Sequence, residues 1–399
     1  MKYAALAAIV VVSGCHNKPQ GDGSSCTPLG AAAGGVSDGG VDGGACFYPA
    51  TMAAVRTPCG DVTEYCDKTA TPTPNLACLT APAPMRPATP AKVTLTGFVH
   101  VFSSGPDSSS TTVQVFDAAT VMNGADPAGA QAIGTQVTTL DPATQRACDV
   151  DGGRGCSLPL AGGCQLPTCN DGLNGNRDDH KYCRDNGAGG ECSGRLRWES
   201  RYFIDGVPTN TQLVIRVTGP SGSADSTWAT TVAFNVLLST ADRACSNKSD
   251  SDCLDLSDAA RPRYQLNVSA LSEADYVNIP TISGLAGGIR AGQGAIAGEV
   301  HDCDNVRVAY VQVATTPSAD RFTYFNGNPV TTLPDASRAG FGTDRLGLFS
   351  ALNVQPGPVV VETAGAMSAG GPLTSFGSVS AFVYANTVSI VNVNGGKGR

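Results

Sequence analysis

Residues 348–361 read Leu-Phe-Ser-Ala-Leu-Asn-Val-Gln-Pro-Gly-Pro-Val-Val-Val, and this stretch decides the fold. A short, mostly apolar run precedes Pro356-Gly357, and a run of valines follows it. Pro-Gly is a strong turn signal, and β-branched residues such as valine favour strands. The stretch therefore predicts two short strands joined by a turn.

An alternating pattern at residues 92–102 predicts another strand. Apolar side chains and Gly97 fall on one face of a period-two pattern, and Thr94, Thr96 and His100 fall on the other. Beyond the N-terminal leader no stretch shows helical periodicity, so no long helix is expected. Further strands are expected at Thr112–Phe116, Arg195–Ile204, Thr211–Thr218, Trp228–Leu238, Arg263–Ser269, Ala295–His301, Val306–Ala314, Leu348–Leu352, Pro358–Thr363, Ser378–Tyr384 and Thr387–Val393.

The composition supports a strand-and-turn protein outside the cytosol. The 399 residues include 48 glycines and 25 prolines, and only 15% are charged. Fifteen cysteines disfavour a reducing compartment. The net charge is −8, and no basic stripe is present, so nucleic acid is not expected as a partner.

The N-terminus predicts export and lipid attachment. Lys2 precedes an apolar run from Ala4 to Val12 that is too short to span a bilayer. Val12-Ser13-Gly14-Cys15 resembles the lipobox of bacterial lipoproteins. The resemblance implies that residues 1–14 are a signal peptide of the Sec pathway, that Cys15 carries diacylglycerol and that its new amine is acylated. His16 stands where that family often has an inner-membrane Asp, which implies the outer membrane or the cell surface. The alternative is an ordinary secretory signal.

Residues 15–91 read as a disordered, disulfide-stapled tether. Glycine-rich and Thr-Pro or Ala-Pro segments alternate there. Without Cys15 the chain has an even number of cysteines, as a fully bonded exported protein would. The tether holds Cys26, Cys46, Cys59, Cys66 and Cys78.

An internal repeat follows the tether. Gly97-Phe98-Val99-His100 matches Gly298-Glu299-Val300-His301, and Val113-Gln114-Val115 matches Val311-Gln312-Val313. Two domains of one plan are therefore predicted. The expected equivalent pairs are Gly97/Gly298, Phe203/Phe349 and Gly219/Gly365.

The order of these motifs resembles the carboxypeptidase-regulatory-like (transthyretin-like) domain. The resemblance covers residues 294–395 and, less closely, 92–238. It implies an all-β fold of two tandem Greek-key β-sandwiches, at 92–283 and 289–396. Members of that family serve as scaffolds, usually without catalytic residues of their own.

Cysteine-rich loops interrupt the first copy. Residues 141–194 form an insertion with six cysteines, and Cys245 and Cys253 are spaced for one local disulfide. Cys303 is the only cysteine of the second copy, so parity predicts a bond to one of the five tether cysteines. The competing interpretation is a free Cys303.

No catalytic residue and no metal site is assigned. The Gly35–Gly39 stretch matches G-x-S-x-G but lies in the glycine-rich tether, without the strand and helix of a nucleophile elbow. Residues 170–179 are rich in Asn and Asp, so calcium is a weak possibility, and a polar turn is the simpler interpretation. His100 and His301 are expected at a surface or edge rather than on a metal. Trp198, Tyr202 and Phe203 are expected in the core rather than on a sugar platform.

The predicted function is that of a non-enzymatic cell-envelope lipoprotein. Its membrane partner is reached through the lipid anchor, and an envelope protein or polysaccharide is the expected ligand. No cofactor is expected. The alternatives are a structural spacer, which predicts no concave or apolar patch, and a hydrolase with an unrecognised site in the insertion.

Overall fold

The computed structural model describes most of the chain after residue 86 and short parts before it. The described residues are 27–28, 46–57, 71–80, 87–102, 108, 111–121, 127, 129–138, 200–219, 228–245, 251–255, 262–327 and 332–394. The predicted signal peptide, Cys15, the insertion 141–194, the calcium candidate 170–179 and Trp198 lie outside them.

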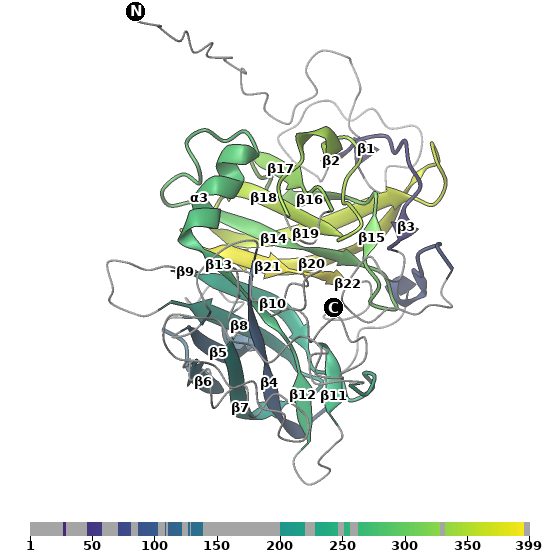
Figure 1. The fold of residues 1–399 in the computed structure, drawn as a ribbon. Coiled ribbons are helices and arrows are strands. Elements are labelled where there is room, and N and C mark those ends of the chain that lie inside the picture. The colour runs from purple at the N-terminus through teal and green to yellow at the C-terminus, as the bar shows by residue number, and fades with distance from the viewer. Residues whose placement is uncertain are drawn as a thin grey trace, which may run out of the picture.

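The fold is all-β, as predicted, and its largest sheet has nine strands (Figure 1). Strands of the two sequence copies meet within this sheet, because β10 pairs in parallel with β21. In order across the sheet its strands are β17 (Arg321–Tyr324), β18 (Leu348–Val354), β14 (Gly294–His301), β21 (Val388–Val391), β10 (Thr231–Leu237), β8 (Gln212–Thr218), β5 (Thr112–Asp117) and β6 (Gly134–Val137), with β22 (Val393–Asn394) also on β14.

Two further sheets pack against the large one. The six-stranded sheet contains β11 (Cys253–Asp255), β12 (Arg263–Gln265), β4 (Lys92–Val101), β13 (Val268–Ser272), β9 (Trp228–Ala229) and β7 (Ser200–Pro208). The three-stranded sheet contains β16 (Gln312–Thr316), β19 (Gly357–Ala366) and β20 (Leu373–Val383). Short pairs join β1 (Thr27–Pro28) to β2 (Cys46–Phe47) and β3 (Val55–Arg56) to β15 (Val308–Ala309).

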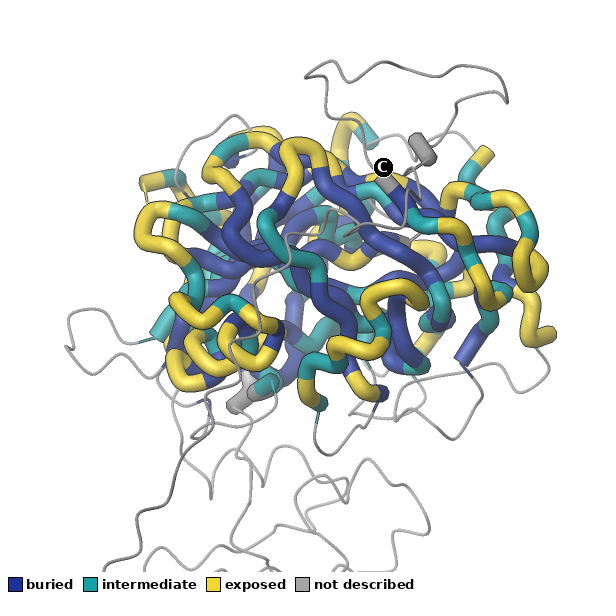
Figure 2. The backbone as a smooth tube through the Cα atoms, turned by 90° about the horizontal axis from the view of Figure 1, so that it is seen from above, coloured by how far each residue is buried: buried dark blue, intermediate teal, exposed yellow. Residues whose placement is uncertain are grey.

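The first-copy half of the nine-stranded sheet is buried on both faces. Val115 and Ile215 point into a core shared with Leu95 of the six-stranded sheet. Phe116 and Val214, one residue along each strand, belong to a second core that contains residues of β19 and β20. Because alternate side chains point to opposite faces, this half is the middle of three layers, and the buried backbone runs through the centre of the molecule (Figure 2).

The two copies share one pattern of strand pairing. β4 pairs antiparallel with β7 and parallel with β12 and β13, and β14 pairs in the same way with β18 and with β21 and β22. The order β5-β8-β10 likewise matches β16-β19-β20.

Gly97 and Gly298 occupy the same place in this pattern. The side-chain carbonyl of Asn267 accepts a hydrogen bond from the Phe98 amide at 2.9 Å, and that of Asn392 accepts one from the Glu299 amide at 3.2 Å. At both glycines the neighbouring backbone comes so close that a Cβ atom would lie under 2 Å from a carbonyl oxygen. Glycine is therefore the one residue that fits here.

The other two expected equivalent pairs are wrong by one and two residues. Gly97 lies opposite Tyr202 and Gly298 lies opposite Phe349, so Tyr202, not Phe203, corresponds to Phe349. A slip of one residue turns a side chain to the other face. Phe349 is accordingly buried, whereas Phe203 is 43% exposed.

Gly365 corresponds to Val217 rather than to Gly219. The strand register pairs Gln114 with Arg216 and Gln312 with Ala364. One residue further along each strand, Gly365 of β19 is therefore the equivalent of Val217 of β8. The eighteen-residue spacing that the two copies share is coincidental.

A helix that sequence periodicity did not predict, α3 (Glu273–Ile282), links the two copies. Ser272 caps it, since its hydroxyl accepts a hydrogen bond from the Asp275 amide at 3.0 Å. Val277 and Ile282 are at least half exposed, so the helix lacks a single apolar stripe. Shorter helical segments are α1 (Ala118–Val121), η1 (Ala77–Thr80) and η4 (Ala336–Arg338).

Parts of the predicted tether belong to the folded body. Phe47 is 1% exposed and packs against Ala314 and Ala364. The Ala54 amide donates to the Ala366 carbonyl at 2.7 Å, and β3 pairs with β15. Residues 46–57 and 71–80 therefore lie on the second copy, along the side marked by β3 in Figure 1.

Candidate functional site

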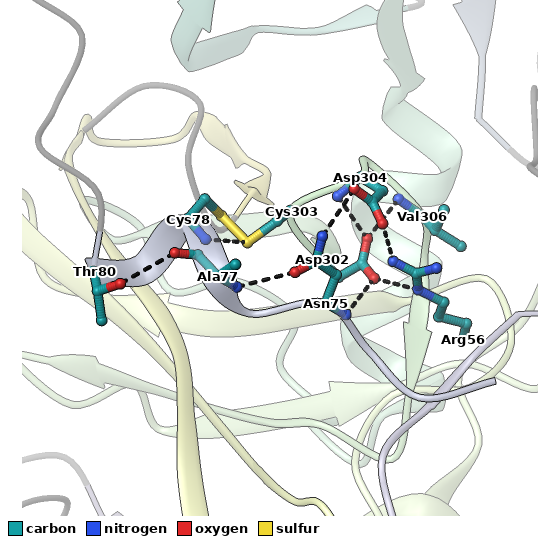
Figure 3. The surroundings of a disulfide bond; sticks show 9 residues. All are labelled: Arg56, Asn75, Ala77, Cys78, Thr80, Asp302, Cys303, Asp304 and Val306. Carbon is teal, nitrogen blue, oxygen red and sulfur yellow. Dashed lines mark hydrogen bonds and ion pairs between the residues drawn. A yellow bond between two sulfur atoms is a disulfide. The ribbon is translucent and has the colours of Figure 1, made fainter. Parts of the chain in front are cut away.

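A disulfide fastens the N-terminal segment to the second copy. Cys78, in η1, is bonded to Cys303, which lies 225 residues along the chain, as cysteine parity predicted (Figure 3). A second bond joins Cys245 to Cys253, also as predicted.

Asp302, next to this disulfide, organises the surrounding backbone. Its carboxylate accepts hydrogen bonds from the amides of Asn75 at 2.9 Å, Asp304 at 3.0 Å and Val306 at 3.1 Å. The Arg56 guanidinium is 2.5 Å from the same carboxylate and also contacts Asp304. The Arg56 side chain is only 8% exposed and that of Asp302 is fully buried. We call Arg56, Asn75, Cys78, Asp302 and Cys303 the clamp. Both oxygens of the Asp302 carboxylate accept hydrogen bonds within it, so we assign the clamp a structural role.

His301 is buried, which corrects the expectation of a surface or edge residue. It is 5% exposed, and its Nε2 lies 2.7 Å from a Glu299 carboxylate oxygen while Nδ1 lies 2.9 Å from Asn305. Arg307 holds the other Glu299 oxygen at 2.8 Å. Asn305 donates in turn to Asp252 of the first copy at 3.0 Å. Glu299 and His301 of β14 thus belong to a network that reaches the first copy through Asn305 and Asp252.

The charge network lowers the pKa of Glu299. Burial alone would raise this pKa, but the Arg307 charge and the His301 hydrogen bond outweigh it and hold the pKa at about 2. A folded-state pKa below the usual 4.5 means that the stabilisation is complete above pH 4.5 and is lost as the pH falls towards about 2.

We expect Glu299→Gln to lower the free energy of unfolding by about 2–3 kcal/mol at pH 7, because Arg307 loses its buried partner. The difference from wild type should shrink steadily between pH 4.5 and 2.5, where Glu299 of the unfolded chain becomes protonated. Urea unfolding at several pH values measures this. Glu362→Gln, at a partly exposed position of β19, is the control and should change stability by less than about 0.5 kcal/mol. A pH-independent difference for Glu299→Gln would contradict the assignment.

The aromatic candidates divide between core and surface. Tyr202 is fully buried, as expected, and its hydroxyl donates to the Leu266 carbonyl at 2.6 Å. Phe203 points outward, so its predicted place in the core is wrong. His100 is only partly buried and its ring lies 6.4 Å from that of Phe98. It shares a repeat position with His301, but the two occupy different sheets.

A hollow of the described fold lies between α3 and the outer face of the nine-stranded sheet. Tyr276, Ile279 and Pro280 of α3 form one wall. Ala295, Ala297 and Glu299 of β14 form part of the opposite wall, because alternation turns Ile296 and Val300 into the core on the other face. Leu271, Ile289, Leu352, Val388 and Ile390 complete an apolar lining. Its volume is about 150 Å³, and it is partly open to solvent. We call this hollow the α3 cavity.

Two hydroxyl groups of the cavity wall lack hydrogen-bond partners among the described residues. They belong to Tyr276 and Ser350, and Ser350 is only 3% exposed. Buried polar groups are normally satisfied, so each of these hydroxyl groups keeps an unused capacity to donate and accept hydrogen bonds. Burial, with help from the Glu273 charge, raises the pKa of Tyr276 to about 12, so its hydroxyl is neutral.

The described residues do not assemble a metal centre. No group of three or more His, Cys, Asp or Glu among them is placed to hold an ion. Within the same residues no helix is both long and apolar enough to cross a membrane.

Comparison of the chain with protein-family models, with curated proteins and with solved structures finds no match.

Proposed function

We propose that the chain is a non-enzymatic, lipid-anchored protein of the cell envelope whose α3 cavity is a ligand-binding site. The cavity is the observation that carries this proposal. A pure spacer predicts no apolar hollow, whereas pockets at the boundary between repeated units are common ligand sites. The cavity is built from both copies, since Leu271 and Ser269 come from β13 and most of the remaining lining from the second copy.

The anchoring part of the proposal rests on Val12-Ser13-Gly14-Cys15. Because Thr27 pairs with Phe47, which packs on the second copy, the anchor reaches the folded body through the residues between Cys15 and Thr27. At about 3.5 Å per residue these span at most about 40 Å. The clamp also fastens Arg56, Asn75 and Cys78 to the second copy, so the anchor is connected to a fixed part of the fold.

The resemblance to carboxypeptidase-regulatory-like domains supports a binding role rather than a catalytic one. Both copies keep the same strand pairing, which is what a duplicated scaffold of that kind requires. A hydrolase site in residues 141–194 lies outside the described residues and draws no support from the cavity.

The anchor is tested by Cys15→Ser in a Gram-negative host. We expect the wild-type protein to enter the detergent phase, to incorporate labelled palmitate and to begin at Cys15 after processing. The Cys15→Ser protein should lose the label, and the amount found in the detergent phase should fall at least about ten-fold, because the acyl chains on Cys15 supply most of the membrane affinity. Cys303→Ser is the control and should keep its label. Unchanged detergent partition of Cys15→Ser would overturn the anchor.

A further inference from the structure

We propose that the α3 cavity binds a small, neutral, largely apolar molecule that carries one hydrogen-bonding oxygen, of about the size of a phenol. This inference deepens the proposed binding function and rests on it. It follows from three properties of the cavity, which are its volume, its charge and its unpaired hydroxyl groups.

The volume sets the size of the ligand. A dry cavity of about 150 Å³ lined by Leu, Ile and Phe accommodates a single benzene-sized molecule. The α3 cavity has this volume, and its lining is dominated by Leu271, Ile279, Leu352 and Val388. The part of a ligand that lies inside the cavity is therefore about the size of one aromatic ring.

The charge of the wall excludes anions. Asp275 and Glu299 line the cavity, and none of the residues lining it is Lys, Arg or His. Glu299 is held as a carboxylate by Arg307 and His301, which are engaged behind it. A ligand carboxylate would therefore face a negative wall without a countercharge, which costs free energy in a poorly solvated site.

The unpaired hydroxyl groups select an oxygen on the ligand. A hydroxyl group both donates and accepts hydrogen bonds, so Ser350 and Tyr276 fit a phenol, an alcohol or a carbonyl equally well. Both residues line the cavity, and their hydroxyl oxygens are closed off from solvent. The Ser350 hydroxyl reaches a ligand by turning between staggered positions about χ1. A ligand oxygen that reaches either hydroxyl removes an unsatisfied buried group.

Three probes of similar size separate these properties. Binding of p-cresol, toluene and benzoate to the full processed chain is measured by titration calorimetry and ligand-observed NMR. We expect p-cresol to bind about three- to ten-fold more tightly than toluene, which corresponds to one hydrogen bond. We expect benzoate to bind at least about ten-fold more weakly than p-cresol.

Variants locate the binding and assign the hydroxyl groups. Ala297→Phe fills the cavity and should weaken p-cresol binding at least about ten-fold, while Ala369→Phe in an exposed turn should leave it unchanged. Ser350→Ala with Tyr276→Phe should reduce the preference for p-cresol over toluene to less than two-fold and leave toluene binding intact. Both substitutions remove unpaired oxygens, so folding is preserved.

The outcomes test separately the ligand class, the role of the hydroxyl groups and the location of the binding site. If benzoate binds best and Ala297→Phe abolishes its binding, the ligand class is wrong and the cavity remains a binding site. If toluene matches p-cresol in the wild type, the role of the hydroxyl groups is overturned. If no probe binds, or if p-cresol binding survives Ala297→Phe, the cavity is not the site and the proposed binding function fails with it.

Discussion

Gly298→Ala is expected to lower the free energy of unfolding by more than about 3 kcal/mol or to prevent folding. An alanine Cβ would lie 1.9 Å from the Val391 carbonyl oxygen and 3.1 Å from the Phe349 ring. The close neighbour is backbone of the paired strand, which cannot rotate away as a flexible side chain would. Gly97→Ala should have a comparable effect in the first copy, where the Leu266 carbonyl oxygen is 1.8 Å from the Cβ position.

Gly340→Ala and Gly287→Ala are the matched controls for these substitutions. No heavy atom lies within 4 Å of the Cβ position of either residue, so both should change stability by less than about 1 kcal/mol. Chemical denaturation followed by fluorescence measures all four variants. Equal, small effects at Gly97, Gly298 and the controls would show that the shared close strand approach in the two copies is wrong.

Arg56→Met is expected to destabilise the protein by about 3–5 kcal/mol, because it leaves the buried Asp302 carboxylate without its cation. Part of this loss should return in the double variant with Asp302→Asn, which removes the stranded charge and keeps one acceptor oxygen for the Asp304 and Val306 amides. The Cys78–Cys303 bond stays intact in every variant, so the comparison isolates the ion pair.

The surface ion pair of Arg290 with Asp320 provides the control for Arg56→Met. Its side chains are 60% and 38% exposed, so Arg290→Met should cost less than about 1 kcal/mol. Urea unfolding and proteolysis within residues 46–57 are read together. If Arg56→Met costs no more than Arg290→Met, the N-terminal segment is not part of the cooperative fold.

Most strands and both described disulfides could be predicted because their signals are local or numerical. The sequence predicts no strand at β6 or β17, however, and the expected strands Val306–Ala314 and Arg263–Ser269 are each divided into two. Alternation over residues 92–101 and the valines after Pro356-Gly357 give strands of the expected extent. Parity alone identified Cys303 as the residue whose partner lies in the N-terminal segment. The exact equivalence of the copies could not be predicted, because the strand register is set by pairing between strands that are distant in sequence. In addition, adjacent aromatic residues such as Tyr202 and Phe203 are alike in sequence, so either one could match Phe349.

The candidate site could not be predicted from the sequence, because it depends on one short helix without an apolar stripe and on which residues of distant strands face that helix. The α3 helix buries Asp275 and Pro280, only half-buries Tyr276 and Ile279, and exposes Val277 and Ile282, which hides its periodicity. Val12-Ser13-Gly14-Cys15 could suggest an anchor from sequence alone, whereas a cavity depends on where α3 lies over the sheet. His301 can be buried because Glu299 pairs with both His301 and Arg307, and this pairing cannot be read from the sequence. For α3, the one local signal was the capping pair Ser272 and Asp275.

Methyl-resolved NMR of the full processed chain, titrated with p-cresol, tests the central claim most directly. The account predicts chemical-shift changes at methyl groups that line the α3 cavity, namely Ile279, Ile289, Leu352, Val388 and Ile390. Methyl groups of the separate first-copy core, such as Leu95 and Ile215, should stay unchanged. Shifts confined to the cavity methyl groups would establish it as the binding site, whereas unchanged cavity methyl groups, or changes centred on Leu95 and Ile215, would contradict the account.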